Sequence, residues 1–263
     1  MQISGSVIVI TGAANGIGAA MAERFAAEGA ELLVLSDLDG ERLDEVAGQI
    51  NASGRRAIAQ ACNVANEAEI RALADRAVAE AGRIDLFCSN AGVMITGDET
   101  APDADWLAAW SVNVMAHVHA SSAVLPAMLE RGSGYLLNTC SAAGLLTSLG
   151  AAPYAVSKHA AVAFSEWLAI TYGSRGIGVS ALCPQGVRTK MIEDAIESGA
   201  GGAVSSGGTM LEADAVAGQV VAALSENRFL ILTHPETQTF AERKVADVGR
   251  WIRGMQKFAA AAT

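Results

Sequence analysis

Tyr154 and Lys158 stand four residues apart, and Ser141 precedes the tyrosine by thirteen residues. On a helix, residues at this four-residue spacing share one face. A phenol is a poor base near neutral pH because its reference pKa is about 10, and lowering it by about three units takes roughly 4 kcal/mol. One ammonium about 4 Å away supplies roughly that much at an effective dielectric constant of about 20. The residue pair can therefore move a proton.

A tyrosine and a lysine at this spacing more often cover a surface turn, so the interpretation depends on other segments. The most informative is the opening run, where the apolar residues 7–10 lead into a glycine-rich turn. Gly12 lets the chain turn tightly out of a strand, Gly16 lets backbone approach a pyrophosphate, and Gly18 lets the following helix pack closely on the sheet. The N-terminus of that helix favours phosphate. The pattern predicts a dinucleotide site.

Asp37 follows the next apolar run, about twenty residues after the glycines. A carboxylate at this place accepts the ribose hydroxyls of an adenosine and repels a 2′-phosphate. Asn15 agrees, because a basic residue there would indicate a 2′-phosphate partner. The alternative is that Asp37 caps a helix beginning near Gly40, a role for which Asp39 competes. We favour the ribose role, and NAD over NADP as the cofactor.

Residues 4–258 resemble the short-chain dehydrogenase/reductase family in its compact single-domain form. The similarity rests on motifs that are specific in combination, namely T-G-x-x-x-G-x-G at 11–18, N-A-G at 90–92, Asn113, Ser141, and Y-x-x-x-K at 154–158. The resemblance implies a Rossmann-like α/β fold with a doubly wound, parallel, seven-stranded sheet covered by helices on both faces. It also implies hydride transfer between an alcohol or ketone and a nicotinamide.

The family pattern assigns roles to four catalytic residues. Tyr154 would be the general acid/base, Lys158 would lower the pKa of that tyrosine and bind the nicotinamide ribose, and Ser141 would hydrogen-bond the reacting oxygen. Asn113 would interrupt its helix and help to hold a water that links Lys158 to solvent. The resemblance implies cofactor contacts from Gly12, Asn15, Gly16, Ile17, Gly18, Asp37, Asn63, Val64, Asn90, Ala91, Gly92, Tyr154, Lys158, Pro184, Gly186, Val187 and Thr189. It places Ser141, Leu146, Tyr154, Gln185 and Met191 at the substrate.

Two positions depart from the family pattern and bear on specificity. Asn63 stands where an aspartate is usual near the adenine, and its amide can still meet an adenine edge. Gln185 stands where glycine is common after the sixth strand, so its side chain is expected to point toward the substrate. Nearby apolar residues such as Met94, Leu146 and Met191 suggest a pocket for an apolar alcohol or ketone, although they could equally be core residues.

The length and composition fit one α/β domain, residues 1–263, without an internal linker. The apolar runs are too short to span a bilayer and no basic leader precedes them, so we expect a cytoplasmic protein. The formal charge of −10 and the lack of a basic stripe argue against nucleic acid. The cysteines and histidines form no metal-binding pattern, so no metal is expected. Strands are predicted near 6–10, 31–36, 57–61, 84–88, 134–139, 177–182 and 229–232.

Two segments outside the motifs have predicted roles. Residues 190–210 contain a run of small residues, and by family resemblance we interpret them as a lid over the substrate. Residues 236–258 form a helical extension with an apolar stripe, which must be buried on the chain's own core or on another subunit. The small residues Ala155, Ala160 and Ala163 would allow close packing between subunits, so we predict a homo-oligomer, a homotetramer or homodimer.

The leading hypothesis is an NAD-dependent alcohol dehydrogenase or ketone reductase that acts on a secondary alcohol or ketone, with Tyr154 handling the proton. One alternative is an NADPH-dependent reductase of 3-ketoacyl substrates, which Asp37 and Asn15 oppose. Another is a non-catalytic NAD-binding scaffold or sensor, which the intact catalytic residues oppose.

Overall fold

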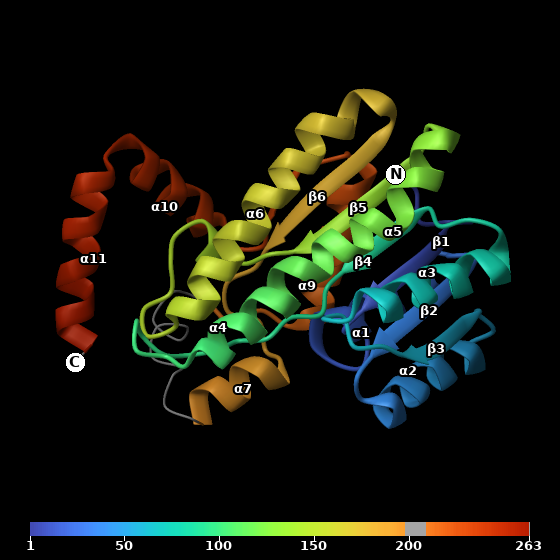
Figure 1. Cartoon of the computed structure of the whole chain (residues 1–263), viewed down its shortest axis with the longest axis horizontal. Helices are drawn as coiled ribbons and strands as arrows, with labels where there is room; N and C mark the ends of the chain where they lie inside the picture. The colour runs from blue at the N-terminus through green and yellow to red at the C-terminus, as the bar shows by residue number, and fades with distance from the viewer. Residues whose placement is uncertain (198–208, 263) are drawn as a thin grey trace.

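A single parallel sheet of seven strands forms the centre of the chain. The computed structural model describes residues 1–197 and 209–262 (Figure 1). The strand order is β3-β2-β1-β4-β5-β6-β7, and every neighbouring pair is parallel. This confirms the predicted Rossmann-like sheet. The strands are β1 (Val7–Thr11), β2 (Leu32–Asp37), β3 (Ala57–Ala61), β4 (Leu86–Ser89), β5 (Gly134–Thr139), β6 (Ile177–Cys183) and β7 (Leu230–Leu232).

Helices cover both faces of this sheet, so the central strands β1, β2 and β4 are buried along almost their whole length. Along β1, Ile8 and Ile10 pack with residues of α1, α2 and α9, while Val7 and Val9 face α3 and α5. The helical elements are α1 (Gly16–Ala27), α2 (Gly40–Ala52), α3 (Glu67–Ala81), α4 (Asp103–Trp110), η1 (Ser111–Met115), α5 (Ala116–Arg131), η2 (Ala142–Gly144), α6 (Ala152–Tyr172), η3 (Gly173–Arg175), α7 (Lys190–Glu197), α9 (Ala213–Ser225), α10 (Pro235–Ala246) and α11 (Val248–Ala262).

The chain winds outward from β1 in two directions, toward β3 on one side and toward β7 on the other. The carboxyl ends of β1, β4 and β5 therefore meet where the strand order reverses. In an open parallel sheet this is the place where ligands bind. The predicted glycine turn, the N-A-G segment and Ser141 follow these three strands directly.

One described helical segment, Asp103–Arg131, is long and apolar enough to cross a membrane by length and composition. Half of its apolar window is buried inside the fold. Its second part, α5, packs on α3 and on strands β4 and β5. Packing within the domain thus accounts for its apolar character.

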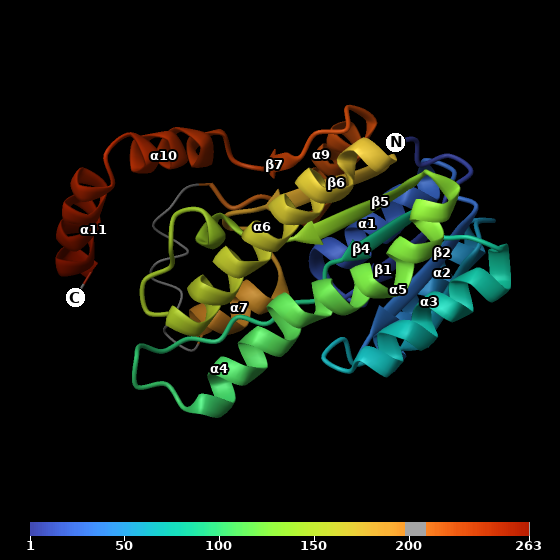
Figure 2. The same cartoon turned by 45° about the horizontal axis from the view of Figure 1, so that its top comes forward.

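The last two helices stand apart from the rest of the molecule. Both views show α10 leading away from the sheet and α11 at the far end of the chain (Figures 1 and 2). The helical conformation is interrupted between them at Asp247, whose backbone is extended. Its Oδ1 accepts a hydrogen bond from Arg250 N at 2.8 Å at the start of α11. The predicted helical extension 236–258 is therefore a two-helix arm. Of the predicted lid 190–210, α7 covers 190–197, and residues 198–208 lie outside the described residues.

Candidate active site

The predicted proton-transfer pair lies in the first turns of α6. This helix begins at Ala152 with Pro153 in its first turn, where a proline is favourable because no intrahelical N–H is needed. The Lys158 ammonium lies 5.8 Å from the centre of the Tyr154 ring. Lys158 Nζ also donates a 2.9 Å hydrogen bond to Thr139 O at the end of β5. The lysine is 3% exposed, so the sheet edge and α6 hold its charge inside the protein.

Asn113 lies in η1, a π-helical turn between α4 and α5. Its Oδ1 accepts from Val93 N at 3.0 Å, and its Nδ2 donates to Val93 O at 2.9 Å and to Ser157 Oγ at 3.0 Å. The predicted helix interruption is therefore present. A Cβ at Gly92 would lie 3.2 Å from Asn113 Oδ1 and 3.4 Å from Lys158 Nζ. Gly92 thus leaves room for these two side chains beside the loop after β4.

Ser141 is positioned as the residue before the short helix η2. Its Oγ accepts a 3.1 Å hydrogen bond from Ala143 N, so the hydroxyl hydrogen remains to be donated elsewhere. A Cβ at Gly144 would lie 2.4 Å from Lys158 O, so the glycine lets η2 approach α6 closely. The Ser141 hydroxyl interacts with the Tyr154 phenol. The two side chains predicted to hold one reacting oxygen are therefore neighbours.

The pKa of Tyr154 differs from the sequence-based expectation. Burial raises it above its ordinary value, the Ser141 hydroxyl lowers it, and the charges of Cys140 and Cys183 raise it further. Burial also lowers the pKa of the Lys158 ammonium. The sequence predicts that the Lys158 ammonium lowers the tyrosine pKa. Here burial outweighs that effect, because removing the phenol from water disfavours its charged form. At neutral pH the phenol is an acid with a proton to give.

His117 is a buried group beside this site that the sequence interpretation missed. It is 1% exposed, and neither ring nitrogen has a hydrogen-bond partner among the described residues. Burial and the Lys158 charge lower its pKa to about 3. The imidazole is therefore neutral at physiological pH. No spacing in the sequence shows that α5 turns this histidine toward Lys158.

The glycine turn after β1 is shaped for a close backbone approach. Gly12 has φ +67°, a left-handed conformation that favours glycine, and a Cβ at Gly18 would lie only 2.0 Å from Gly12 O. Asn90 ties the turn to the end of β4, since its Nδ2 donates to Thr11 O at 3.1 Å and to Gly12 O at 3.2 Å. The resulting turn and the N-terminus of α1 fit the pyrophosphate of a dinucleotide.

Asp37 lies beside that turn at the end of β2. Its Oδ2 accepts a 3.0 Å hydrogen bond from Ala14 N, and its Oδ1 accepts one of 2.7 Å from Leu38 N. The helix-capping alternative belongs to Asp39, whose Oδ1 accepts from Arg42 N at 3.1 Å at the start of α2. Asp37 is thus left to face the adenosine end of the turn.

The remaining predicted cofactor residues surround the same edge. Asn63 Oδ1 accepts from Ala65 N at 3.0 Å in a local turn, which leaves its amide Nδ2 as the group that we expect at an adenine. Thr189 lies against the glycine turn, since a Cβ at Gly16 would be 2.9 Å from its Cγ2. Pro184 O accepts from Ala142 N at 2.8 Å, which joins the loop after β6 to η2. Asn15, Ile17, Val64, Ala91, Gly186 and Val187 lie in these same segments.

A cavity of about 860 Å³ adjoins the catalytic residues. Ser141, Tyr154 and two predicted substrate residues, Leu146 and Gln185, line it. Gln185 Oε1 is buried and has no hydrogen-bond partner among the described residues, so it can accept one from a substrate. Met191 does not line the cavity and is 37% exposed, because α7 turns the next residue, Ile192, inward instead.

The far wall of this cavity comes from α10 and α11. The residues that the sequence interpretation did not place there are Phe240, Arg243, Ala246, Asp247, Arg250, Trp251, Gly254, Met255 and Phe258. The apolar stripe of this segment was recognisable from its helical spacing. Only the fold shows that part of it faces the catalytic residues.

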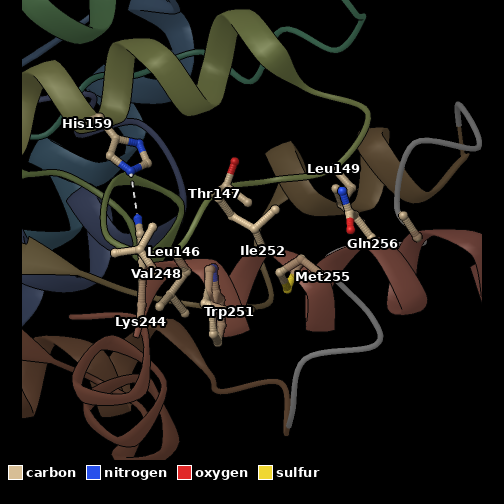
Figure 3. A pocket seen from close by; sticks show the side chains of 11 residues that line it. Leu146, Thr147, Leu149, His159, Lys244, Val248, Trp251, Ile252, Met255 and Gln256 are labelled. Atoms are coloured by element: carbon tan, nitrogen blue, oxygen red, sulfur yellow. Dashed lines mark hydrogen bonds between the residues drawn. The ribbon is translucent and has the colours of Figure 1, made fainter. Parts of the chain in front are cut away.

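A second cavity, of about 430 Å³, adjoins the first and shares Leu146, Thr147, Trp251 and Met255 with it. Figure 3 shows Leu146, Thr147 and Leu149 from the loop after η2 facing Trp251, Ile252 and Met255 of α11. Lys244 Nζ donates to Leu145 O and lies 3.4 Å from His159 Nε2 (Figure 3). This lysine fastens the end of α10 to the loop and to α6.

Comparisons with known proteins agree with this geometry. The family model described as short chain dehydrogenase matches residues 6–199. A 1-deoxy-11-beta-hydroxypentalenate dehydrogenase of Streptomyces exfoliatus is 34% identical, over 96% of this chain and 91% of its own. A meso-2,3-butanediol dehydrogenase of Serratia marcescens is 36% identical, over 73% of this chain and 75% of its own. The solved structure of a short chain dehydrogenase/reductase from Burkholderia phymatum in complex with NAD has a TM-score of 0.87 at 33% identity, and the match covers 94% of this chain and 95% of that one.

The chain therefore belongs to the short-chain dehydrogenase family. It is an oxidoreductase that interconverts an alcohol and a ketone with a nicotinamide cofactor, as the sequence predicts.

Proposed function

We propose that this protein is an NAD-dependent dehydrogenase of secondary alcohols in which Tyr154 transfers the proton. The observation that carries the proposal is that Ser141 and Tyr154 line the large cavity together, beside the loop after β6. Bound there, the nicotinamide would accept a hydride from the alcohol carbon or deliver one to the ketone carbon.

The residues of the chain handle the oxygen and its proton. In ketone reduction the neutral Tyr154 phenol donates its proton to the carbonyl oxygen, and Ser141 donates a second hydrogen bond to that oxygen. The Lys158 ammonium stabilises the phenolate that remains. Asn113 fixes the Val93 backbone and Ser157 around this lysine. In alcohol oxidation the same groups act in reverse.

The preference for NAD rests on Asp37. Its carboxylate lies on the glycine turn, held by Ala14 N and Leu38 N. A 2′-phosphate at this place would meet a like charge, whereas the two ribose hydroxyls would donate to the carboxylate. An NADPH-dependent 3-ketoacyl reductase is the less favoured alternative for this reason.

The substrate is proposed to be larger than a four-carbon diol. The relative named for butanediol matches 73% of the chain, whereas the one named for 1-deoxy-11-beta-hydroxypentalenate matches 96%, which must take in most of α10 and α11. These helices form the far wall of the cavity. The longer match supports a substrate that reaches this wall.

The replacement Tyr154→Phe tests the proposal directly. We expect kcat to fall about a thousand-fold with NADH and a panel of ketones, since positioned acid–base groups contribute factors of that order. NADH binding, followed by fluorescence, should be retained. Near-full turnover in the variant would refute the role of Tyr154, and NADH binding without turnover by the wild type would favour the scaffold alternative.

We further propose a cytoplasmic homo-oligomer, as a tetramer or dimer. The outer faces of α4 and α6 expose Leu107, Trp110, Val156, Trp167 and Ile170, an apolar surface typical of an interface. Of the alanines expected there, Ala163 is exposed, whereas Ala155 is buried against the core. Light scattering at micromolar concentration tests the assembly, with Trp167→Glu as the variant expected to weaken it.

A further inference from the structure

The far wall of the large cavity carries charge as well as apolar surface. Apart from the reacting end at Ser141 and Tyr154, its lining is mainly apolar, with Met94, Leu146, Ile192, Phe240, Trp251, Met255 and Phe258. The charged residues on it are Arg243, Asp247 and Arg250, all from the junction of α10 and α11. The two ends of the cavity thus have different chemistry, one suited to a hydroxyl or carbonyl group and one to an ion.

The two arginines are available to an anion. None of the ion pairs recorded among the described residues involves Arg243 or Arg250. Asp247 uses its Oδ1 to cap α11 at Arg250 N. The local charge is therefore positive on a chain whose formal charge is −10, where the overall field repels anions. A guanidinium pairs well with a carboxylate because its donors match the two oxygens.

The cofactor does not account for this charge. The phosphate-binding turn at 12–18 and Asp37 are absent from the cavity lining, which runs from the catalytic residues and the loop after β6 to the C-terminal arm. A volume of about 860 Å³ is also far more than a small ketone needs, since pockets of roughly 300–1,000 Å³ hold drug-sized ligands. A bulky molecule would fill it from the catalytic end to the arginines.

We propose that the substrate is a bulky, largely apolar alcohol or ketone with a carboxylate remote from the reacting carbon, and that Arg243 and Arg250 bind this carboxylate. The inference rests on the proposed dehydrogenase function and deepens it by naming the substrate class. It modifies the sequence-based expectation of an apolar alcohol or ketone by adding one remote charged group. Phe240 and Trp251, whose rings lie 6.4 Å apart, hold the two helices that carry the arginines together.

The test compares rigid polycyclic keto acids with their methyl esters, using 3-, 7- and 12-oxo bile acids as probes. The ester removes the charge and leaves the apolar body and the ketone unchanged. We measure kcat/KM with NADH in the wild type, and binding by calorimetry in the Tyr154→Phe protein with NADH, where turnover does not obscure it. The acid should be favoured over its ester by about ten-fold, with a smaller preference at high salt.

Three variants locate the effect. Arg243→Gln and Arg250→Gln should each reduce the preference for the acid, and the double variant should bring the ratio close to one without weakening ester binding. Arg253→Gln is the matched control, because this residue lies on α11 but not on the cavity wall. Circular dichroism checks that the exposed substitutions leave the fold intact.

The outcomes separate the two proposals. Equal binding of acid and ester, an unchanged ratio in the double variant, or no binding of either probe below about 1 mM would overturn the carboxylate site. An arginine-dependent preference for the acid, without turnover of any ketone with NADH or NADPH, would support the site and refute the dehydrogenase function.

Discussion

The cofactor edge, meaning the carboxyl ends of the strands with the glycine turn and the catalytic residues, and the C-terminal arm of α10 and α11 are built very differently. At the edge, a Cβ at Gly18 would lie 2.0 Å from Gly12 O, and Lys158 is 3% exposed. On the arm, Val245 is 83% and Ile252 50% exposed, and Lys244 fastens α10 to the body. We therefore expect the cofactor edge, which is closely packed, to tolerate little change, and the exposed arm that we propose for substrate selection to tolerate more.

The largest effect on NAD binding is expected from adding a methyl group at Gly18, on the cofactor edge. Gly18→Ala would place a Cβ against Gly12 O and 2.6 Å from Asn90 Nδ2, so the turn must move. We expect NAD affinity to fall at least a hundred-fold by calorimetry. Gly48→Ala is the matched control, because a Cβ there meets nothing within 4 Å and an alanine favours the helix by about 0.5–1 kcal/mol. Equal NAD binding in both variants would show that the edge is more tolerant than its packing implies.

Asp37 tests whether the same edge selects the cofactor. In Asp37→Ser the like charge that opposes a 2′-phosphate is gone, so the ratio of kcat/KM for NAD over NADP should fall about ten- to a hundred-fold. Asp39→Ser is the control, since Asp39 caps α2 and serine is also a good cap. A ratio that stays constant in Asp37→Ser would remove the argument for NAD.

The pKa of Tyr154 tests how strongly burial acts at the catalytic end. Without cofactor, the ultraviolet titration of the wild type minus that of Tyr154→Phe should report a phenol pKa above the ordinary value of about 10. The phenolate is the proton acceptor in alcohol oxidation, so below this pKa its fraction rises about ten-fold per pH unit. Ketone reduction uses the protonated phenol and should not share this rise. A phenol titrating near pH 7 in the free protein would mean that Lys158 outweighs burial.

The smallest effect, a change in KM, is expected at Lys244, which links α10 to the loop after η2. Lys244→Met removes the hydrogen bond to Leu145 O and the contact with His159. We expect KM for a bulky ketone to rise about three- to ten-fold with little change in kcat, because this lysine positions the arm and does not reach the reacting oxygen. KM for a small ketone such as acetoin should stay constant. Lys257→Met, at an exposed position on α11, is the control, and equal effects on both ketones would show that the arm does not select by size.

The sequence anticipated the cofactor edge more fully than the arm. The seven predicted strands lie within about two residues of the observed ones, since buried apolar runs mark strands locally. The Tyr154 pKa is raised, which is opposite to the expected direction. The spacing to the Lys158 ammonium is visible in the sequence, whereas the burial of the phenol depends on the tertiary structure. Met191 was predicted to face the substrate, but the neighbouring Ile192 lines the cavity instead. The sequence does not show how a helix is rotated about its axis against the rest of the fold.

The sequence by itself indicated the family and its doubly wound parallel sheet and predicted the catalytic set, because the glycine turns and the four-residue spacing of Tyr154 and Lys158 are local patterns. Only the tertiary structure decided what the apolar C-terminal stripe packs against. It brought Arg243 and Arg250, about a hundred residues beyond Ser141, onto the same cavity. Helical periodicity shows that a face is apolar, whereas the partner of that face depends on the path of the whole chain.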